Sequence, residues 1–288
     1  MEKGRIIKLT GGLYTVENDL KERKNLKARG VFRHRNLSPK VGDIVEYDDE
    51  FITKVFDREN DLVRPPVANV DQAILINAAK EPDFSYYLLD RFLVLIEKEN
   101  ITPVIVVSKT DLLSPTEFDT LREGLAYYEQ FYDVYYVNVK DAQTFVPLKA
   151  LLKDKVSVFA GQTGAGKSSL LNGLDIKLQL ETGEISKALG RGRHTTRHSE
   201  LIHVYDGLVA DTPGFSKLDF YDIDIDLLPE LYIDFFKLGD HCKFRACTHI
   251  NEPKCAVKKA VEDQVIPKQR YDNYRLIYDE IKHQKKKY

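Results

Sequence analysis

Nine residues, GQTGAGKSS at positions 161–169, constrain the fold of this chain more than any other stretch. They fit the pattern Gly-x4-Gly-Lys-Ser. The preceding residues, 155–160 (KVSVFA), are typical of a short buried strand, and residues 167–174 (KSSLLNGL) are typical of the first turns of a helix. A strand, a glycine-rich turn and a helix in this order form a P-loop, whose backbone N–H groups and helix N-terminus surround a phosphate. We therefore expect a nucleotide-binding α/β domain.

The P-loop prediction gives particular residues a role. Lys167 is expected to reach the β- and γ-phosphates and to take part in catalysis, while the Ser168 hydroxyl is expected to bind Mg²⁺. The alternative is a glycine-rich turn without a ligand, which the correct flanking elements disfavour. The residues expected to bind the nucleotide here are Gly161, Gln162, Thr163, Gly164, Ala165, Gly166, Lys167, Ser168 and Ser169.

Composition and charge limit the classes of protein to consider. Hydrophobic residues make up 43% and charged residues 31% of the 288 positions, as in soluble globular proteins. No apolar run suits a signal peptide or approaches the roughly 18 residues of a spanning helix, so we expect a cytoplasmic protein that binds no membrane. The net charge is +2 in residues 1–64, −10 in 65–236 and +6 in 237–288. The basic ends indicate a polyanionic partner, or else only a solvated surface.

The first 64 residues alternate between short apolar–polar segments and turn residues. Five strands are predicted, at Arg5–Leu9, Leu13–Glu17, Arg29–Arg33, Asp43–Tyr47 and Phe51–Phe56. This pattern favours a small barrel, and the OB-fold is the five-stranded barrel that binds nucleic acid. Between Lys21 and Lys40 stand eight Lys or Arg and one Glu. We expect this stretch to form a barrel loop that contacts a phosphate backbone, although a solvated loop would carry the same charges.

Beyond Arg64-Pro65-Pro66, strands and helices are predicted in alternation. Strands are expected at residues 70–76, 103–107, 133–137 and 155–160, and helices near 88–96, 116–131 and 147–152. This order predicts a doubly wound sheet with ligands beyond the carboxyl ends of its strands. The chain is long for one domain, and we expect three: an OB-fold domain at 1–64, a nucleotide-binding domain at 65–218 and a helical domain at 219–288.

The loop Ser108-Lys109-Thr110-Asp111 follows the predicted strand 103–107 and is similar to the Asn-Lys-x-Asp element of GTPases. Asp111 is expected to accept hydrogen bonds from the N1–H and N2–H₂ groups of guanine, which adenine lacks. All four residues are expected to bind GTP. Ser108 replaces the usual Asn, and its shorter side chain predicts weaker contacts to the base or to the P-loop. A simple turn is the alternative for this loop.

Two segments after the P-loop are expected to complete the nucleotide site. The basic loop 190–198 (GRGRHTTRH) offers Thr195 or Thr196 as a ligand of Mg²⁺ when a γ-phosphate is present. A hairpin at 199–210 then leads to Asp211-Thr212-Pro213-Gly214. Asp211 is expected to act as the second protein partner of Mg²⁺, and the Gly214 N–H to face the γ-phosphate.

All three cysteines lie close together near the C-terminus, in the pattern Cys-x4-Cys-x-His-x5-Cys. Three thiolates and one imidazole are the ligand set of a closed structural zinc site. An odd number of cysteines argues against disulfides, and free core cysteines are the alternative. His241 is a rival ligand, but it adjoins the first cysteine in an awkward arrangement. The predicted ligands are Cys242, Cys247, His249 and Cys255.

These motifs occur in an unusual order, because the 108–111 element precedes the P-loop. Common GTPases have the P-loop first, so this chain has a circularly permuted order, which surface termini that lie close together make tolerable. An OB-like barrel, a permuted P-loop G domain and the Cys₃His module together resemble the ribosome small subunit-dependent GTPase A family (RsgA, also called YjeQ or YloQ). The resemblance spans nearly the whole chain.

The resemblance implies a cytoplasmic GTPase that binds GTP and GDP with Mg²⁺ and holds one structural Zn²⁺. It also implies a late role in the assembly of the small ribosomal subunit, through contact with its rRNA. We expect a monomer that does not bind DNA. One departure from the family is that residues 138–141 lack a clear Ser-Ala guanine loop.

Hydrolysis is expected to be slow in the isolated protein. Phe215 stands where Ras-like enzymes have the Gln that orients the attacking water, and a phenyl ring cannot do so. His194 is the best internal candidate for this catalytic role, as the resemblance also suggests; contact with RNA or solvent is its alternative. Two other functions remain open: a P-loop ATPase or small-molecule kinase, and an RNA-binding nucleotide switch with negligible hydrolysis.

Overall fold

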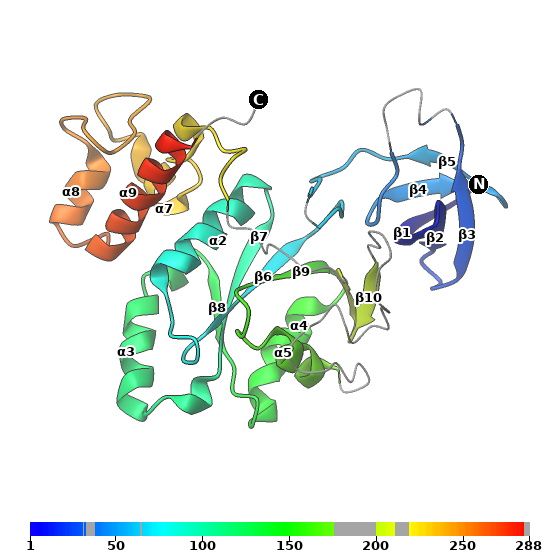
Figure 1. Ribbon diagram of the computed structural model, residues 1–288, viewed down its shortest axis with the longest axis horizontal. Helices are drawn as coiled ribbons and strands as arrows, with labels where there is room; N and C mark the ends of the chain where they lie inside the picture. The colour runs from blue at the N-terminus through cyan, green and yellow to red at the C-terminus, as the bar shows by residue number, and fades with distance from the viewer. Residues whose placement is uncertain (31, 33–37, 64, 176–199, 211–218, 285–288) are drawn as a thin grey trace.

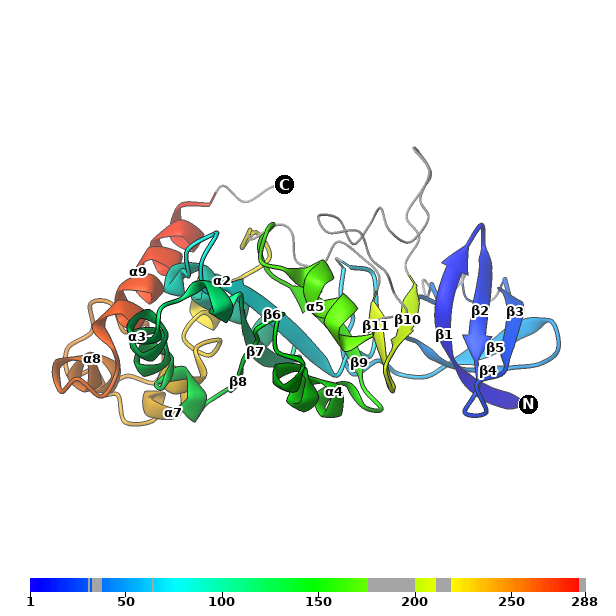
Figure 2. The same ribbon diagram turned by 90° about the horizontal axis from the view of Figure 1, so that it is seen from below.

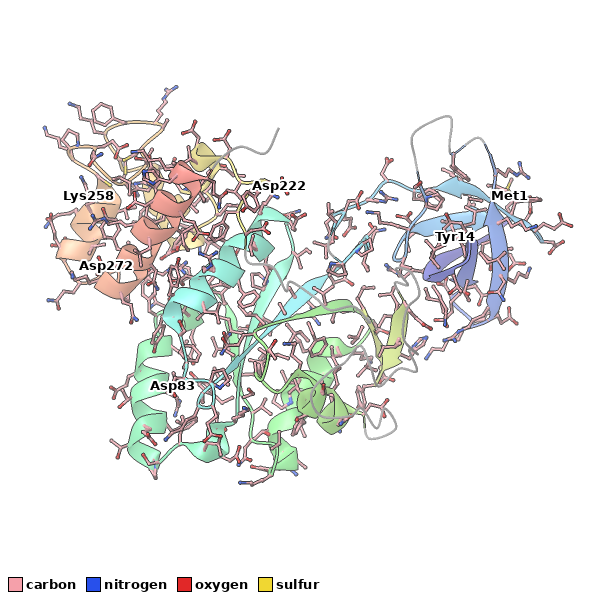
Figure 3. The ribbon with its side chains drawn as sticks, viewed as in Figure 1. Met1, Tyr14, Asp83, Asp222, Lys258 and Asp272 are labelled. Atoms are coloured by element: carbon pink, nitrogen blue, oxygen red, sulfur yellow. The ribbon has the colours of Figure 1, made fainter. Side chains whose placement is uncertain are left out.

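The structure, a computed structural model, describes residues 1–284 apart from 31, 33–37, 64, 176–199 and 211–218. Figures 1 and 2 show a β-barrel, a central sheet layered with helices and a helical module, with the sheet between the other two parts. The barrel carries the N-terminus, and the module carries the last helix. In Figure 3, Tyr14 marks the barrel, Asp83 marks the central part, and Lys258 and Asp272 mark the module.

The barrel is closed, in the order β1-β2-β3-β5-β4. Its strands are β1 (Glu2–Thr10), β2 (Leu13–Glu17), β3 (Arg23–Ala28), β4 (Ile44–Tyr47) and β5 (Phe51–Val55). Neighbouring strands are antiparallel except β3 and β5. The alternation seen in the sequence places apolar side chains inside, among them Ile6, Val16, Val45 and Ile52, which are fully buried. The prediction of a five-stranded barrel is confirmed.

The predicted position of the third strand is wrong. We expected Arg29–Arg33, whereas β3 is Arg23–Ala28 and is part of the basic stretch assigned to a loop. Leu26 is the one residue of β3 that is buried, so the strand lacks the apolar alternation that identifies a strand in a sequence. Backbone pairing with β2 defines it instead.

The central sheet has six strands in the order β10-β11-β9-β6-β7-β8, and β10 alone runs antiparallel to its neighbour. The strands are β6 (Gln72–Ala78), β7 (Thr102–Ser108), β8 (Asp133–Tyr136), β9 (Val156–Ala160), β10 (Leu201–Val204) and β11 (Gly207–Ala210). Every residue of β6 and β9 is buried, which explains why their sequences are largely apolar.

Helices cover both faces of this sheet, as the doubly wound prediction requires. One face packs against α2 (Tyr86–Lys98) and α3 (Pro115–Leu125), and the other against α4 (Val146–Leu152) and α5 (Lys167–Leu174). Helix α3 begins with a capping box between Ser114 and Glu117. It ends at Leu125 instead of reaching 131, because the chain tightens into 3₁₀ turns. The 3₁₀ helices are η1 (Thr110–Leu112), η2 (Tyr128–Gln130), η3 (Ala142–Phe145) and η4 (Ile225–Leu227).

The module consists of α7 (Ile233–Gly239), α8 (Ala256–Glu262) and α9 (Lys268–His283). Its apolar core includes Tyr232, Phe235 and Tyr274 and extends to Val94 and Leu95 on the outer side of α2. The module therefore shares its core with the central part of the molecule. None of the helices formed by the described residues is long and apolar enough to span a bilayer.

A buried ionic network also joins the module to α2. The guanidinium of Arg270 on α9 lies between the carboxylates of Asp90 on α2 and Asp234 on α7, 2.9 Å from Asp234. Asn273 and Tyr128 donate further hydrogen bonds to Asp90, at 2.7 and 2.8 Å. Because each buried charge is paired and hydrogen-bonded, the network fixes α9 against α2.

Candidate nucleotide and metal sites

The P-loop has the backbone that its glycines predict. Gly161, Gly164 and Gly166 all have positive φ angles, of 135°, 83° and 87°. At Gly161 there is no room for a side chain, since a Cβ would lie 2.2 Å from the carbonyl oxygen of Ile76 on the neighbouring strand β6. Gly166 is the N-cap of α5. The loop thus forms a close-fitting turn between β9 and the helix N-terminus, which suits a phosphate.

Lys167 and Ser168 occupy the first turn of α5. The Lys167 ammonium donates to the carbonyls of Gly161 and Gln162 at 2.7 and 2.8 Å, so its side chain lies along the loop. Burial lowers the pKa of Lys167. A phosphate beside it would favour the charged form. Ser168 is 7% exposed, on the first turn, where its hydroxyl suits a hard cation bound to a phosphate.

Ser108 makes the contact to the P-loop that its short side chain had put in doubt. It ends β7, is buried, and donates from Oγ to the carbonyl of Ala165 at 2.6 Å. The same hydroxyl lies 3.4 Å from the carbonyl oxygen of Asn77 on β6. A serine hydroxyl therefore reaches the P-loop, because β7 and the P-loop lie close together.

The remaining residues of the 108–111 loop lie at the carboxyl ends of the sheet strands, near the P-loop. Lys109, in a left-handed conformation, donates from Nζ to the carbonyl of Glu81, and Thr110 donates from Oγ1 to the carbonyl of Val137 at 3.1 Å. The Asp111 carboxylate lies 2.8 Å from the ammonium of Lys140. Asp111 is thus held at the carboxyl ends of β7 and β8, where a doubly wound sheet binds its ligand.

Sequence reasoning missed Lys140. Residues 138–141 lack a Ser-Ala pair, but their loop follows β8 and reaches Asp111. Asn138 shapes the loop, because its side-chain oxygen accepts from the N–H of Lys140 at 2.8 Å. The sequence did offer one signal for this contact, because the loop follows the strand that neighbours β7 and so lies at the same edge of the sheet as Asp111.

Several predicted site residues lie outside the described residues. They are His194, Thr195, Thr196, Asp211 and Gly214, and Phe215 falls in the same segments. Their neighbours in sequence are described, since β10 starts at Leu201 and β11 ends at Ala210. β11 pairs with β9 in parallel, so its carboxyl end points to the same edge of the sheet as the P-loop.

The four predicted metal ligands come together in the module. The ligand atoms of Cys242, Cys247, His249 and Cys255 all lie within 4.8 Å of one another. Cys242 Sγ is 3.9 Å from Cys255 Sγ, and His249 Nδ1 is 3.3 Å from Cys255 Sγ. Tetrahedral Zn–S bonds of about 2.3 Å place two sulfur atoms roughly 3.8 Å apart, so the cluster has the right size for zinc. His241 is not part of the cluster.

Groups around the cluster hold it in place. Backbone N–H groups of Ala256 and Lys258 donate to the sulfurs of Cys242 and Cys255, at 3.3 and 3.4 Å. Burial raises the pKa of Cys247 to about 12 and lowers the pKa of His249. A neutral imidazole is a metal ligand, and a divalent cation would offset the cost of the buried thiolates.

The metal loop is also connected to α9. Tyr271 donates from its hydroxyl to the carbonyl of His249 at 2.7 Å, and Tyr274 donates to the carbonyl of Thr248 at 2.6 Å. Both tyrosines stand on α9, the helix that carries Arg270. The metal cluster and the buried network against α2 therefore share one helix.

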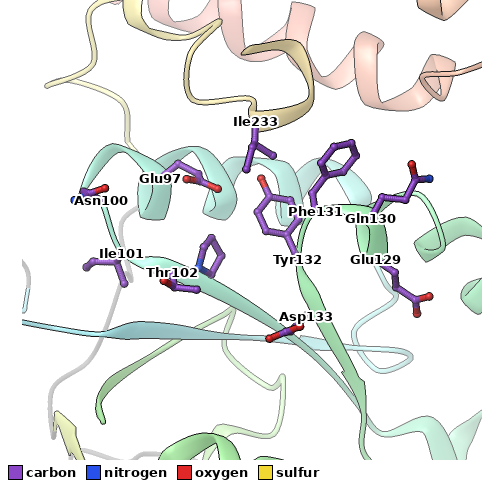
Figure 4. A pocket seen from close by; sticks show the side chains of 11 residues that line it. Glu97, Asn100, Ile101, Thr102, Glu129, Gln130, Phe131, Tyr132, Asp133 and Ile233 are labelled. Carbon is purple, nitrogen blue, oxygen red and sulfur yellow. The ribbon is translucent and has the colours of Figure 1, made fainter. Parts of the chain in front are cut away.

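A cavity of about 510 Å³ lies away from the nucleotide site. It is lined by Glu97, Thr102, Tyr132, Asp133 and Ile233, among others (Figure 4). Thr102 and Asp133 begin β7 and β8, whereas the P-loop and Ser108 lie at the carboxyl ends of their strands. The cavity therefore lies at the opposite end of the sheet from the residues predicted to bind the nucleotide.

Comparison with known proteins agrees with this geometry. The family model described as "RsgA GTPase" matches residues 55–221, and the model "RsgA N-terminal domain" matches residues 3–54. Proteins named small ribosomal subunit biogenesis GTPase RsgA are similar over the full chain. The one from Shouchella clausii is 49% identical and that from Bacillus cereus 48%, with 100% of both chains covered.

Solved structures are similar over the same length. YloQ, described as a circularly permuted GTPase, has a TM-score of 0.86 and 41% identity over 100% of this chain and 97% of its own. YjeQ from Thermotoga maritima has a TM-score of 0.88 and 37% identity, with 99% of each chain covered. The permuted order of motifs is thus matched by a known permuted fold.

Proposed function

Because the chain belongs to the RsgA GTPase family, we propose that it hydrolyses GTP to GDP and phosphate and acts in the late assembly of the small ribosomal subunit. Its partners are that subunit and its rRNA, which suit the basic N-terminal and C-terminal regions. Turnover is slow in the isolated protein and faster on the subunit. The protein acts as a cytoplasmic monomer.

One observation carries the nucleotide part of the proposal. Ser108, next to the guanine-recognition residues, hydrogen-bonds the P-loop through Ala165. A base held by Asp111 and a phosphate chain held at residues 161–169 would therefore lie next to each other at one edge of the sheet. This is the arrangement that a nucleoside triphosphate requires, and Asp111 supplies its guanine specificity.

The chemistry follows from the residues that surround the phosphates. The P-loop amides and Lys167 stabilise the charge that develops on the phosphate oxygens. Ser168 and Asp211, with Thr196 or Thr195, would hold Mg²⁺, which would neutralise that charge. The Gly214 N–H would face the γ-phosphate, and His194 would position the attacking water.

The three cysteines and His249 of the C-terminal cluster would hold one structural Zn²⁺. Four protein ligands would complete a tetrahedral site, so the ion would stabilise the loop and not bind substrate. We assign residues 1–64 to RNA binding, 65–218 to the nucleotide and 219–288 to the zinc module.

The guanine assignment is tested with a nucleotide panel and the variant Asp111→Asn. The wild type should bind GTP and GDP in preference to ATP, because Asp111 finds no donor pair on adenine. The variant should shift its preference towards xanthine nucleotides, whose altered edge suits an amide. Equal affinity for ATP and GTP would favour the P-loop ATPase instead.

The catalytic assignment of His194 has its own test. His194→Ala should abolish most of the stimulation by small subunits while GTP affinity stays within about two-fold, because the imidazole acts on water and not on the nucleotide. Stimulated turnover at the wild-type rate would refute this role and leave His194 as an RNA contact.

A further inference from the structure

The barrel contacts the central sheet through the edge strand β10. Lys8 on β1 forms an antiparallel bridge with Glu200, and their side chains pair at 2.9 Å between Nζ and Oε2. Figure 2 shows β10 between β11 and β1. The edge strand of the nucleotide-binding sheet is thus covered by the first strand of the barrel.

An apolar contact region accompanies this bridge. The register of β1 with β2 shifts between Ile6 and Lys8, so Ile7 occupies a bulge. Bulges redirect a side chain, and Ile7 is only 2% exposed. Ile7 and Leu201 of β10 belong to the same buried cluster, which also contains Ala210 of β11. The barrel and the hairpin therefore share one buried apolar cluster.

Glu17 links the barrel's basic strand to this hairpin. Glu17 is the last residue of β2 and is 8% exposed. Each of its two carboxylate oxygens contacts a different side chain. Oε2 accepts from Nε of Arg23 on β3 at 2.8 Å, and Oε1 lies 2.8 Å from Nε2 of His203 on β10. Arg23 is half exposed and belongs to the basic stretch between Lys21 and Lys40, whereas His203 belongs to the nucleotide-binding sheet.

The hairpin that His203 belongs to is connected in sequence to two predicted parts of the nucleotide site. β10 begins at Leu201, shortly after the loop 190–198, and β11 ends at Ala210, directly before Asp211. A shift of β10 relative to the sheet would therefore act on both segments through the backbone.

We propose that Glu17 and His203 are positioning residues that couple polyanion binding at the barrel to turnover in the nucleotide site. The proposal rests on the proposed function. An RNA phosphate that binds Arg23 competes with Glu17 for the guanidinium. The carboxylate that is released then interacts with His203 alone. β10 transmits the change to the segment that precedes it and, through its hairpin partner β11, to the segment that begins at Asp211. Such a coupling acts in both directions between the two sites.

Three variants test the coupling. His203→Leu and Glu17→Met break the contact from its two sides, while His203→Gln keeps an N–H donor near the position of Nε2. GTP turnover is measured alone and with purified small ribosomal subunits. We expect His203→Leu and Glu17→Met to keep intrinsic turnover within about two-fold of the wild type. Their subunit-stimulated turnover should fall by about five-fold or more, which is the lower end of the range for coupling between two sites. His203→Gln should retain stimulation.

Each other result overturns the coupling. Wild-type stimulation in His203→Leu and Glu17→Met would show that the contact transmits nothing. An equal loss of intrinsic and stimulated turnover, or loss in His203→Gln as well, would assign the contact to structural support only. If the wild-type chain itself is not stimulated by subunits, the proposed function fails, which is a distinct result that also removes the basis of the coupling.

Discussion

The module and the barrel contact the central sheet in different ways. On the module side, Arg270 is 3% exposed and lies between the two carboxylates of Asp90 and Asp234, which are equally inaccessible. On the barrel side, the ion pair of Lys8 and Glu200 leaves 41% and 31% of the two side chains exposed. Buried charges must stay paired, whereas exposed pairs contribute little and are screened by salt.

This difference suggests different mechanical roles. The module shares an apolar core and a buried ionic network with α2, so we expect it to move with the sheet as one body. The barrel contacts the edge strand through a partly exposed ion pair, which water can replace at modest cost, beside a few buried side chains such as Ile7 and Glu17. A rigid joint on one side and an adjustable joint on the other would let RNA contacts at the barrel act on the nucleotide site while the zinc module stays fixed.

Removal of the metal should cause the largest difference in stability between the module and the barrel. Cys247→Ser should lower the zinc content well below one ion per chain, because the site loses one of its three thiolates and its closed four-ligand sphere. Loss of zinc should remove hydrogen-exchange protection from α8 and α9, whose loop contacts depend on His249, while the barrel strands keep theirs. The neighbouring exposed residue provides a control, since His241→Ser should retain the metal. Undiminished zinc in Cys247→Ser would refute the four-ligand assignment.

The next largest effect is expected at the buried network. Arg270→Met leaves Asp90 and Asp234 buried without a counter-charge, which should lower the free energy of unfolding by about 3–5 kcal/mol. The denaturation midpoint in urea measures it. Arg275→Met, at an exposed position of the same helix, should change stability by less than about 0.5 kcal/mol.

A triple variant sharpens this prediction. Asp90→Asn and Asp234→Asn added to Arg270→Met remove the unpaired charges, so part of the lost stability should return. If Arg270→Met unfolds at the same urea concentration as Arg275→Met, the module is not fixed to the sheet by this network.

The rim of the same interface should matter less than its centre. Arg91 on α2 pairs with Glu280 on α9, with Nη2 and Oε1 2.9 Å apart, and Glu280 is 35% exposed. Glu280→Gln should lower the free energy of unfolding by about 1 kcal/mol or less, because water reaches the pair. If Glu280→Gln lowers the free energy of unfolding as much as Arg270→Met does, the energetic difference between the buried network and this partly exposed pair is refuted.

The smallest effect is expected at the barrel joint. Lys8→Met should change the unfolding free energy by about 0.2–1 kcal/mol at low salt, and the difference should shrink in high salt. Urea denaturation at two salt concentrations measures it. A large, salt-independent loss would indicate that the barrel is as firmly fixed as the module.

Much of the architecture follows from the sequence, because local signals there are strong. The P-loop glycines, the apolar runs of β6 and β9, and the cysteine spacing each impose one geometry, and the described structure agrees with the predicted fold class. β3 escaped prediction because a strand with a single buried residue, Leu26, has no hydrophobic period. Strand pairing supplied what the sequence pattern did not.

The contacts between distant segments were the hardest to predict. The short side chain of Ser108 predicted weak contacts, and the sequence did not show that β7 lies close enough to Ala165 for its hydroxyl to reach the P-loop. Lys140 and His203 carry no motif, and their partners Asp111 and Glu17 lie 29 and 186 positions away in the chain. Such pairs depend on how strands are ordered in space, which one sequence does not specify.

The most direct test of the account is phosphate release from GTP by the wild-type protein, with and without purified small ribosomal subunits, and with ATP as the competing substrate. We expect slow release from GTP alone, an increase of about ten-fold or more with subunits, and no comparable release from ATP. Release that subunits do not change, or that ATP supports equally well, would contradict a subunit-dependent GTPase.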